Sequence, residues 1–76
     1  MQEFNISMGS FRQIRAFVAL ATAQPFDVFV GNDRQQVNGK NFIGMFSLDY
    51  TKPVKVRVAC GPEDMLRFQQ EAAQIL

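Results

Sequence analysis

Apolar and polar residues alternate along residues 3–8, and this alternation predicts a strand with one buried face. Phe4, Ile6 and Met8 fall on the buried side. From residue 11 the apolar spacing changes to three and four, which is typical of an amphipathic helix. Ser10 is a suitable N-cap for this helix, and Pro25 is expected to end the segment.

The middle of the chain predicts a hairpin and a short helix. Residues 26–30 are rich in β-branched and aromatic side chains and predict a second strand. Residues 31–33 (Gly-Asn-Asp) suit a turn, so residues 34–37 are expected to form a short polar third strand. Asn41 is expected to cap a short helix over residues 42–48, with Met45 and Leu48 as its buried pair.

The last third of the chain predicts one strand and one helix. Valines alternate with other residues over positions 54–59, which is the clearest strand pattern in the sequence. Pro62 suits the first turn of the helix that follows. The buried stripe of this helix is expected to contain Met65, Phe68, Ala72 and Ile75.

These elements predict an α+β fold in the order βαββαβα, formed by a single domain over residues 1–76. Four alternating strands and three one-faced helices can bury their apolar surfaces as a two-layer, open-faced β-sandwich. We therefore expect a four-stranded antiparallel sheet with the three helices on one face and water on the other.

Composition excludes several kinds of chemistry. The 76 residues contain no histidine, which excludes Ser-His-Asp and Cys-His nucleophilic catalysis and nearly all zinc sites. The single cysteine, Cys60, is expected to be a structural thiol, and the acidic residues are scattered without a catalytic pair. We therefore predict that the protein is not an enzyme and has no catalytic residue, no metal site and no cofactor.

Charge and hydropathy bear on location and partners. The net charge of +1 shows no basic excess, which argues against a nucleic-acid binder. Lys55 and Arg57, with Arg34 nearby, could form a basic stripe on the open face, but apart from Phe29 the stacking aromatic residues of an RNA-binding sheet are not evident. The first residues do not resemble a signal peptide, and no stretch is long and apolar enough to span a membrane. A cytoplasmic location without membrane partners is expected.

Residues 37–48 (Val-Asn-Gly-Lys-Asn-Phe-Ile-Gly-Met-Phe-Ser-Leu) carry a family resemblance. This segment, the order of elements and the pair Phe26-Asp27 resemble HPr, the small phosphocarrier protein of the bacterial phosphoenolpyruvate:sugar phosphotransferase system. The resemblance implies the same open-faced sandwich and a bacterial source. It also implies protein partners such as phosphotransferase-system components or a transcriptional regulator.

The residues that carry chemistry in HPr differ in this sequence. Spacing from Phe26-Asp27 places Arg12 at the position of the phosphoryl-accepting histidine and Ile14 and Arg15 at those of the following arginine and proline. A guanidinium stays protonated at neutral pH and cannot be a nucleophile. The regulatory serine of Gram-positive HPr proteins falls at Asn41, which has no hydroxyl.

Two binding sites remain as candidates. Arg12 and Arg15, near a helix start, are candidates for binding an anion, or are simply two solvated arginines. Five large apolar residues crowd positions 42–48, more than one short helix can bury. An exposed, partner-binding patch is therefore predicted, unless a loop or a second copy covers it. Its predicted residues are Phe42, Ile43, Phe46 and Ser47.

The resemblance also implies that this helix binds a protein partner, because the matching helix of HPr docks on enzyme I, the sugar-specific subunits and regulators. The sequence therefore predicts an HPr-like regulatory or protein-binding module that cannot carry a phosphoryl group on histidine. The alternative is an HPr-fold protein with an unrelated binding role. Its ligand would be a phosphate-bearing molecule or, less readily, nucleic acid.

Overall fold

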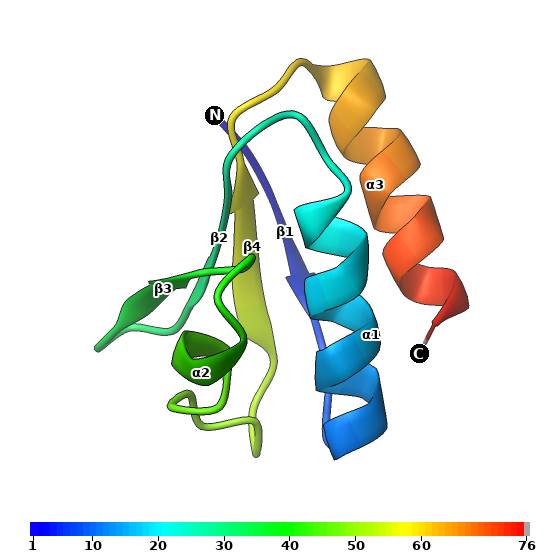
Figure 1. Ribbon diagram of the computed structural model, residues 1–76. Helices are drawn as coiled ribbons and strands as arrows, with labels where there is room; N and C mark the ends of the chain where they lie inside the picture. Colours follow the sequence, from blue (N-terminus) through cyan, green and yellow to red (C-terminus); the bar gives the residue numbers. More distant parts are fainter. Residues whose placement is uncertain (76) are drawn as a thin grey trace.

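The computed structural model describes residues 1–75, in which the four strands and three helices follow the predicted order (Figure 1). The elements are β1 (Gln2–Ile6), α1 (Phe11–Thr22), β2 (Val28–Gly31), β3 (Gln36–Asn38), α2 (Phe42–Met45), β4 (Val54–Val58) and α3 (Pro62–Gln74). None of the helices in residues 1–75 is long and apolar enough to cross a membrane.

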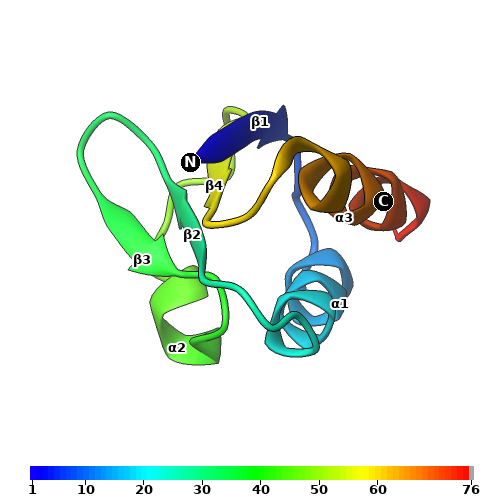
Figure 2. The ribbon, with the colours of Figure 1, turned by 90° about the horizontal axis from the view of Figure 1, so that it is seen from above.

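The strands form one antiparallel sheet in the order β1-β4-β2-β3. Val56, at the centre of β4, is paired with Phe4 of β1 on one side and with Val30 of β2 on the other. Figure 2 shows that α1, α2 and α3 all lie on the same side of this sheet. The predicted open-faced α+β sandwich is therefore confirmed.

The core lies between the sheet and the helices. The inward-facing valines of β2 and β4 are almost completely buried, and so are Phe17 of α1 and Phe68 of α3. The Phe68 ring lies within 6.0 Å of three other rings, measured between centroids: those of Phe4, Phe17 and Phe26. Met45 and Leu48 are buried, as predicted.

The predicted bounds of several elements were wrong. The third strand, expected over residues 34–37, is instead Gln36–Asn38. The side-chain oxygen of Asn32 accepts hydrogen bonds from the backbone N–H groups of Arg34 and Gln35, at 2.9 and 3.0 Å, and holds both residues in the turn. An Asx turn of this kind competes with strand pairing, and the strand starts only beyond it.

Three other elements are shorter than predicted. β1 ends at Ile6 rather than at residue 8, and β2 begins at Val28 rather than at residue 26. The second helix ends at Met45 because the chain then tightens. The backbone N–H groups of residues 46–48 donate to carbonyls three positions earlier, a turn geometry that continues to Leu48.

Candidate functional site

A reciprocal capping box fixes the start of α1. The Gln13 backbone N–H donates to Ser10 Oγ at 3.1 Å, and Gln13 Oε1 accepts from the backbone N–H groups of Gly9 and Ser10 at 2.8 and 3.2 Å. Such a cap satisfies N–H groups that have no partner within the helix. It also fixes the backbone at the first helical residues, and so the directions in which the side chains of Phe11 and Arg12 point.

Local hydrogen bonds and one buried anchor fix α2. The side-chain oxygen of Asn41 accepts from the Gly44 N–H at 3.2 Å and caps the helix. The Met45 side chain is fully buried beneath it, and the Tyr50 hydroxyl donates to the Met45 carbonyl. With Met45 inside, Ile43 and Phe46 fall on other faces and are exposed, whereas Phe42, three residues before Met45, lies at the edge of the buried face and is only partly exposed.

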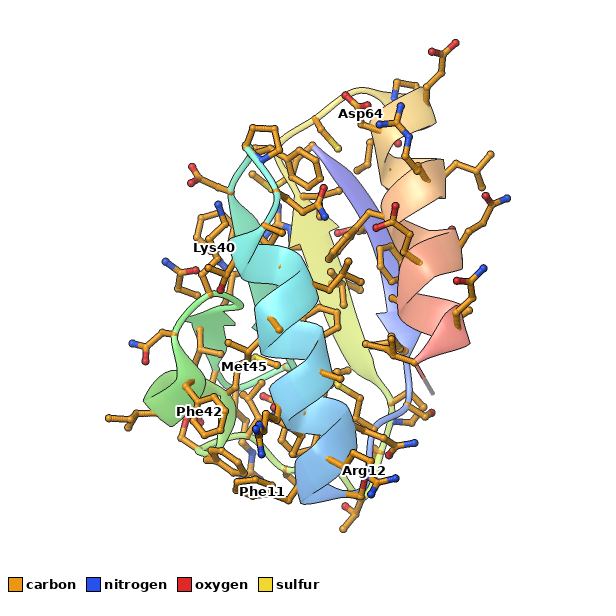
Figure 3. The ribbon with its side chains drawn as sticks, turned by 45° about the vertical axis from the view of Figure 1, so that its right-hand side comes forward. Phe11, Arg12, Lys40, Phe42, Met45 and Asp64 are labelled. Carbon is orange, nitrogen blue, oxygen red and sulfur yellow. The ribbon has the colours of Figure 1, made fainter. Side chains whose placement is uncertain are left out.

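The start of α1 and the helix α2 together present a cluster of three aromatic rings. The Phe11 and Phe46 rings are stacked, with centroids 5.2 Å apart and an interplanar angle of 30°. Phe42 lies 4.9 Å from Phe46 and 6.0 Å from Phe11, centroid to centroid. Figure 3 shows Phe11 and Phe42 side by side, whereas Met45 points inward. We call Phe11, Phe42, Ile43 and Phe46 the aromatic surface.

Water reaches much of the aromatic surface. The exposed fractions are 59% for Phe11, 36% for Phe42, 40% for Phe46 and 83% for Ile43. With about 200 Å² for a whole aromatic side chain, these fractions correspond to roughly 400 Å² of apolar area once Ile43 is included. This is about the size of the largest apolar patch on a typical monomer, and such patches are often functional.

Both helices that carry the aromatic surface lack acidic residues. Neither Phe11–Thr22 nor Phe42–Met45 contains an aspartate or glutamate. Arg12 and Arg15 are exposed, and neither forms an ion pair within residues 1–75. Residues three apart on a helix lie on neighbouring positions of its surface, so the two guanidinium groups give this end of α1 a positive potential.

The structure limits the predicted anion site. The Gln13 N–H is already used by Ser10, which leaves only the N–H groups of Phe11 and Arg12 at the helix start. Figure 3 shows the Arg12 side chain extending into solvent in a direction different from Phe11. The two arginines therefore offer charge to an anion, but no enclosed cradle for it.

The structure places the remaining predicted residues in local roles. Asn41 caps α2, and the Ser47 hydroxyl donates to the Gly44 carbonyl at 2.6 Å. Ser47 also accepts from the Gln35 side chain at 2.7 Å, so its hydroxyl is engaged within the fold. Phe11 was not predicted as part of the patch. Helical spacing places Phe11 three residues before Ile14, at the start of the buried stripe of α1, so the sequence contained no signal that this ring would be exposed.

Two titratable groups outside this region have a raised pKa. Burial raises the pKa of Tyr50 to about 12. Burial, and to a lesser extent the nearby charge of Asp64, raises the pKa of the Cys60 thiol, which disfavours a reactive thiolate. Within residues 1–75 no three histidine, cysteine or acidic side chains gather as a metal site would require.

On the open face of the sheet, the basic residues are partly neutralised. Glu3 lies 3.4 Å from Arg57 and 3.9 Å from Lys55, measured between side-chain oxygen and nitrogen. Arg57 also donates to the Gln36 side chain at 3.3 Å. Phe29, whose strand position is paired with that of Arg57, is half-buried. One aromatic ring beside a neutralised pair is a weak platform for stacking nucleic-acid bases.

Known structures share this architecture. A crystal structure of HPr-C-His from Thermoanaerobacter tengcongensis matches with a TM-score of 0.72 and 25% sequence identity, covering 100% of this chain and 86% of that one. A phosphocarrier protein HPr from Bacillus anthracis matches with a TM-score of 0.72 and 19% identity, covering 99% of this chain and 93% of that one. No protein-family model and no curated protein matches the sequence.

Proposed function

We propose that this HPr-like chain is a regulatory or protein-binding module related to the phosphotransferase system, and that it does not carry a phosphoryl group on histidine. The likeness to phosphocarrier proteins over the whole chain supports the first part. The absence of histidine from the sequence supports the second. In this proposal Arg12 occupies the phosphoryl-accepting position and Asn41 that of the regulatory serine, so binding replaces transfer.

The observation that carries the proposal is the aromatic surface. It contains three rings within 6.0 Å of one another and an isoleucine that is 83% exposed. Contact between these apolar side chains and water is unfavourable. Within residues 1–75 no loop covers them. Phe11, Phe42, Ile43 and Phe46 would be desolvated together by a docking protein, as in the centres of well-packed interfaces.

The charges beside the aromatic surface favour a different protein as the partner over a second copy. Two copies joined through this surface would bring Arg12 and Arg15 near their equivalents, with no carboxylate on α1 or α2 to compensate. A phosphotransferase-system protein or a regulator in the bacterial cytoplasm is the partner we propose.

The proposal is tested with purified bacterial enzyme I as the probe. The chain should bind enzyme I, and Phe46→Asp should weaken binding by at least about thirty-fold, the effect of losing a buried aromatic anchor. Leu66→Asp is the matched control, because Leu66 is an exposed apolar residue of α3 outside the aromatic surface. Circular dichroism should show that both variants are folded.

Three outcomes would count against the proposal. Incubation with phosphoenolpyruvate and enzyme I should give no acid-labile phosphoprotein, and its appearance would refute the loss of phosphoryl transfer. Equal binding by folded Phe46→Asp and the unchanged chain would rule out the aromatic surface. Failure of the chain to bind enzyme I, a sugar-specific subunit or an HPr-dependent regulator would remove the link to the phosphotransferase system.

A phosphate-bearing ligand is the second candidate. It is favoured by the exposed, unpaired guanidinium groups of Arg12 and Arg15 within the described chain. Titration with phosphate, phosphoenolpyruvate or a sugar phosphate should then shift the backbone amide resonances of Arg12 and Gln13. Unchanged resonances at saturating ligand would eliminate this candidate.

A further inference from the structure

A polar cleft lies between the turn that joins β2 to β3 and the loop that leads from α2 into β4. Both segments lie beside α2 in Figure 1. The volume of the cleft is about 420 Å³, which falls within the range of small-molecule sites. Residues 32–35 line it on the turn side, and Ser47, Asp49, Lys52 and Pro53 line it on the loop side. Apart from Ser47, these residues do not belong to the candidate site described above.

The polar cleft carries two charges of each sign. Arg34 and Lys52 are cationic, whereas Asp33 and Asp49 are anionic. All four residues are exposed, and none of them takes part in an ion pair within residues 1–75. Opposite charges that line one cleft without pairing are available to both ends of a ligand that itself carries both charges.

The fold holds the carboxylate of Asp49 in place. One of its oxygens accepts hydrogen bonds from the hydroxyl and the backbone N–H of Thr51, at 2.7 and 2.9 Å. These hydrogen bonds lower the pKa of Asp49, and the nearby charge of Lys52 lowers it further. The carboxylate is therefore ionised at neutral pH, and the hydrogen bonds within residues 1–75 leave its second oxygen free to accept.

Uncharged polar groups join the two sides of the polar cleft. The Gln35 side-chain amide donates to Ser47 Oγ at 2.7 Å, which ties the turn to the end of α2. This bond leaves the side-chain carbonyl of Gln35 as an acceptor. Asn32 uses its side-chain oxygen within the turn and keeps its amide N–H groups as donors. A cleft held in this way loses little conformational entropy when a ligand binds.

We propose that the polar cleft binds a small zwitterion, a free polar amino acid, with its carboxylate at Arg34 and Lys52 and its ammonium group at Asp33 and Asp49. This proposal concerns a site separate from the aromatic surface and does not rest on the proposed function.

The balance of charge in the polar cleft favours a zwitterion over other small ligands. A lone anion would be repelled by Asp33 and Asp49, and a lone cation would be repelled by Arg34 and Lys52. A ligand with both charges meets an opposite charge at each end. An apolar ligand is disfavoured, because Pro53 is the one apolar residue among those that line the cleft.

The exposure of the four charged residues sets the strength of binding that we expect. Ion pairs that contact water contribute little and are screened by salt, so the dissociation constant should be in the millimolar range, about 1–10 mM. The affinity should fall as ionic strength rises.

The test is titration of the full chain with L-serine and with L-glutamine, up to about 100 mM, followed by its backbone amide resonances. Saturable shifts are expected in residues 32–35 and 47–52 and not in α3. Acetate and methylammonium are matched control ligands, because each carries only one of the two charges. Neither should give a saturable shift at the same concentration.

Variants of the lining residues test which charges bind. Arg34→Gln removes one cation and leaves the turn intact, because Arg34 contributes its backbone N–H to the turn and not its side chain. This variant and Asp33→Asn should each weaken binding about two- to five-fold, as expected for an exposed ion pair. Arg34→Gln combined with Lys52→Gln should abolish the saturable shift. Arg67→Gln is the control, because it removes an exposed cation of α3 and should bind like the unchanged chain.

The absence of a saturable shift with both amino acids would overturn the proposal. Equal shifts with acetate or methylammonium would overturn it too, because they would show screening of surface charge in place of binding. Full affinity in the folded double variant would mean that the polar cleft is not the site. Phe46→Asp should bind both amino acids like the unchanged chain, and Arg34→Gln should keep its affinity for enzyme I, so this proposal and the proposed function can fail separately.

Discussion

Replacing Phe11 and Phe46 by alanine, singly and together, measures whether the rings of the aromatic surface hold one another in place. The stacked pair joins the first residue of α1 to the turn after α2, with 5.2 Å between ring centroids. A surface whose side chains are fixed before docking loses less conformational entropy on binding. The strength of this contact therefore bears directly on the proposed function.

The expected magnitude follows from exposure and ring geometry. Phe46 is 40% exposed and Phe11 is 59% exposed. At about 200 Å² for a whole side chain and about 25 cal/mol per Å², the covered areas correspond to roughly 3 and 2 kcal/mol. These are upper bounds, since the unfolded chain also buries apolar area, so each single variant should lose about 1–2 kcal/mol of unfolding free energy.

The double variant should lose less than the sum of the two. Aromatic pairs add about 0.5–1.5 kcal/mol beyond the area they bury, and an exposed pair belongs at the low end of that range. The coupling free energy between Phe11 and Phe46 is therefore expected at about 0.5–1 kcal/mol. The unchanged chain, the two single variants and the double variant form a double-mutant cycle. The effect of each substitution on helix propensity cancels from the coupling free energy, because it is present in both arms of this cycle.

The assay is urea unfolding followed by circular dichroism. Phe11→Ala combined with Leu66→Ala is the control cycle, because these residues share no contact and should be additive within about 0.3–0.5 kcal/mol. If the coupling free energy between Phe11 and Phe46 were no larger than that between Phe11 and Leu66, the two rings would not hold one another in place. The argument for a preformed surface would then fail, although both residues could still contact a partner.

Two further predictions concern the core and its one tyrosine. Phe68→Ala removes a ring that contacts three others and should cost about 3–5 kcal/mol, against a total of about 4–11 kcal/mol for 76 residues. Urea unfolding measures this loss, and a cost below about 1 kcal/mol would contradict the central position of Phe68. Tyr50 should titrate near pH 12, because burial raises its pKa from 10.0 to about 12. The neutral phenol is favoured in the folded state, so its stabilising effect is complete below about pH 10 and is lost as pH rises through the folded value. Tyrosinate absorbance reports Tyr50 alone, since it is the one tyrosine and there is no tryptophan. A midpoint near pH 10 in the folded chain would show that Tyr50 is exposed.

The sequence predicted the fold well where hydrophobic periodicity is strong. The alternating valines of β4 lie between β1 and β2 at the centre of the sheet, and the three-and-four stripe of α1 is buried at Ile14, Phe17, Val18 and Ala21. Such patterns determine which face is buried without knowledge of the partners. Boundaries were predicted less well, because side-chain hydrogen bonds decide them. Asn32 delays β3 by holding Arg34 and Gln35 in the turn.

The candidate site was likewise predicted only in part. The crowding of apolar residues in positions 42–48 predicted that some of them face water, because one turn of helix can bury only one side. It did not predict that Phe11 would join them. The stacking of Phe11 on Phe46 depends on how α1 and α2 approach, and tertiary packing decides that distance.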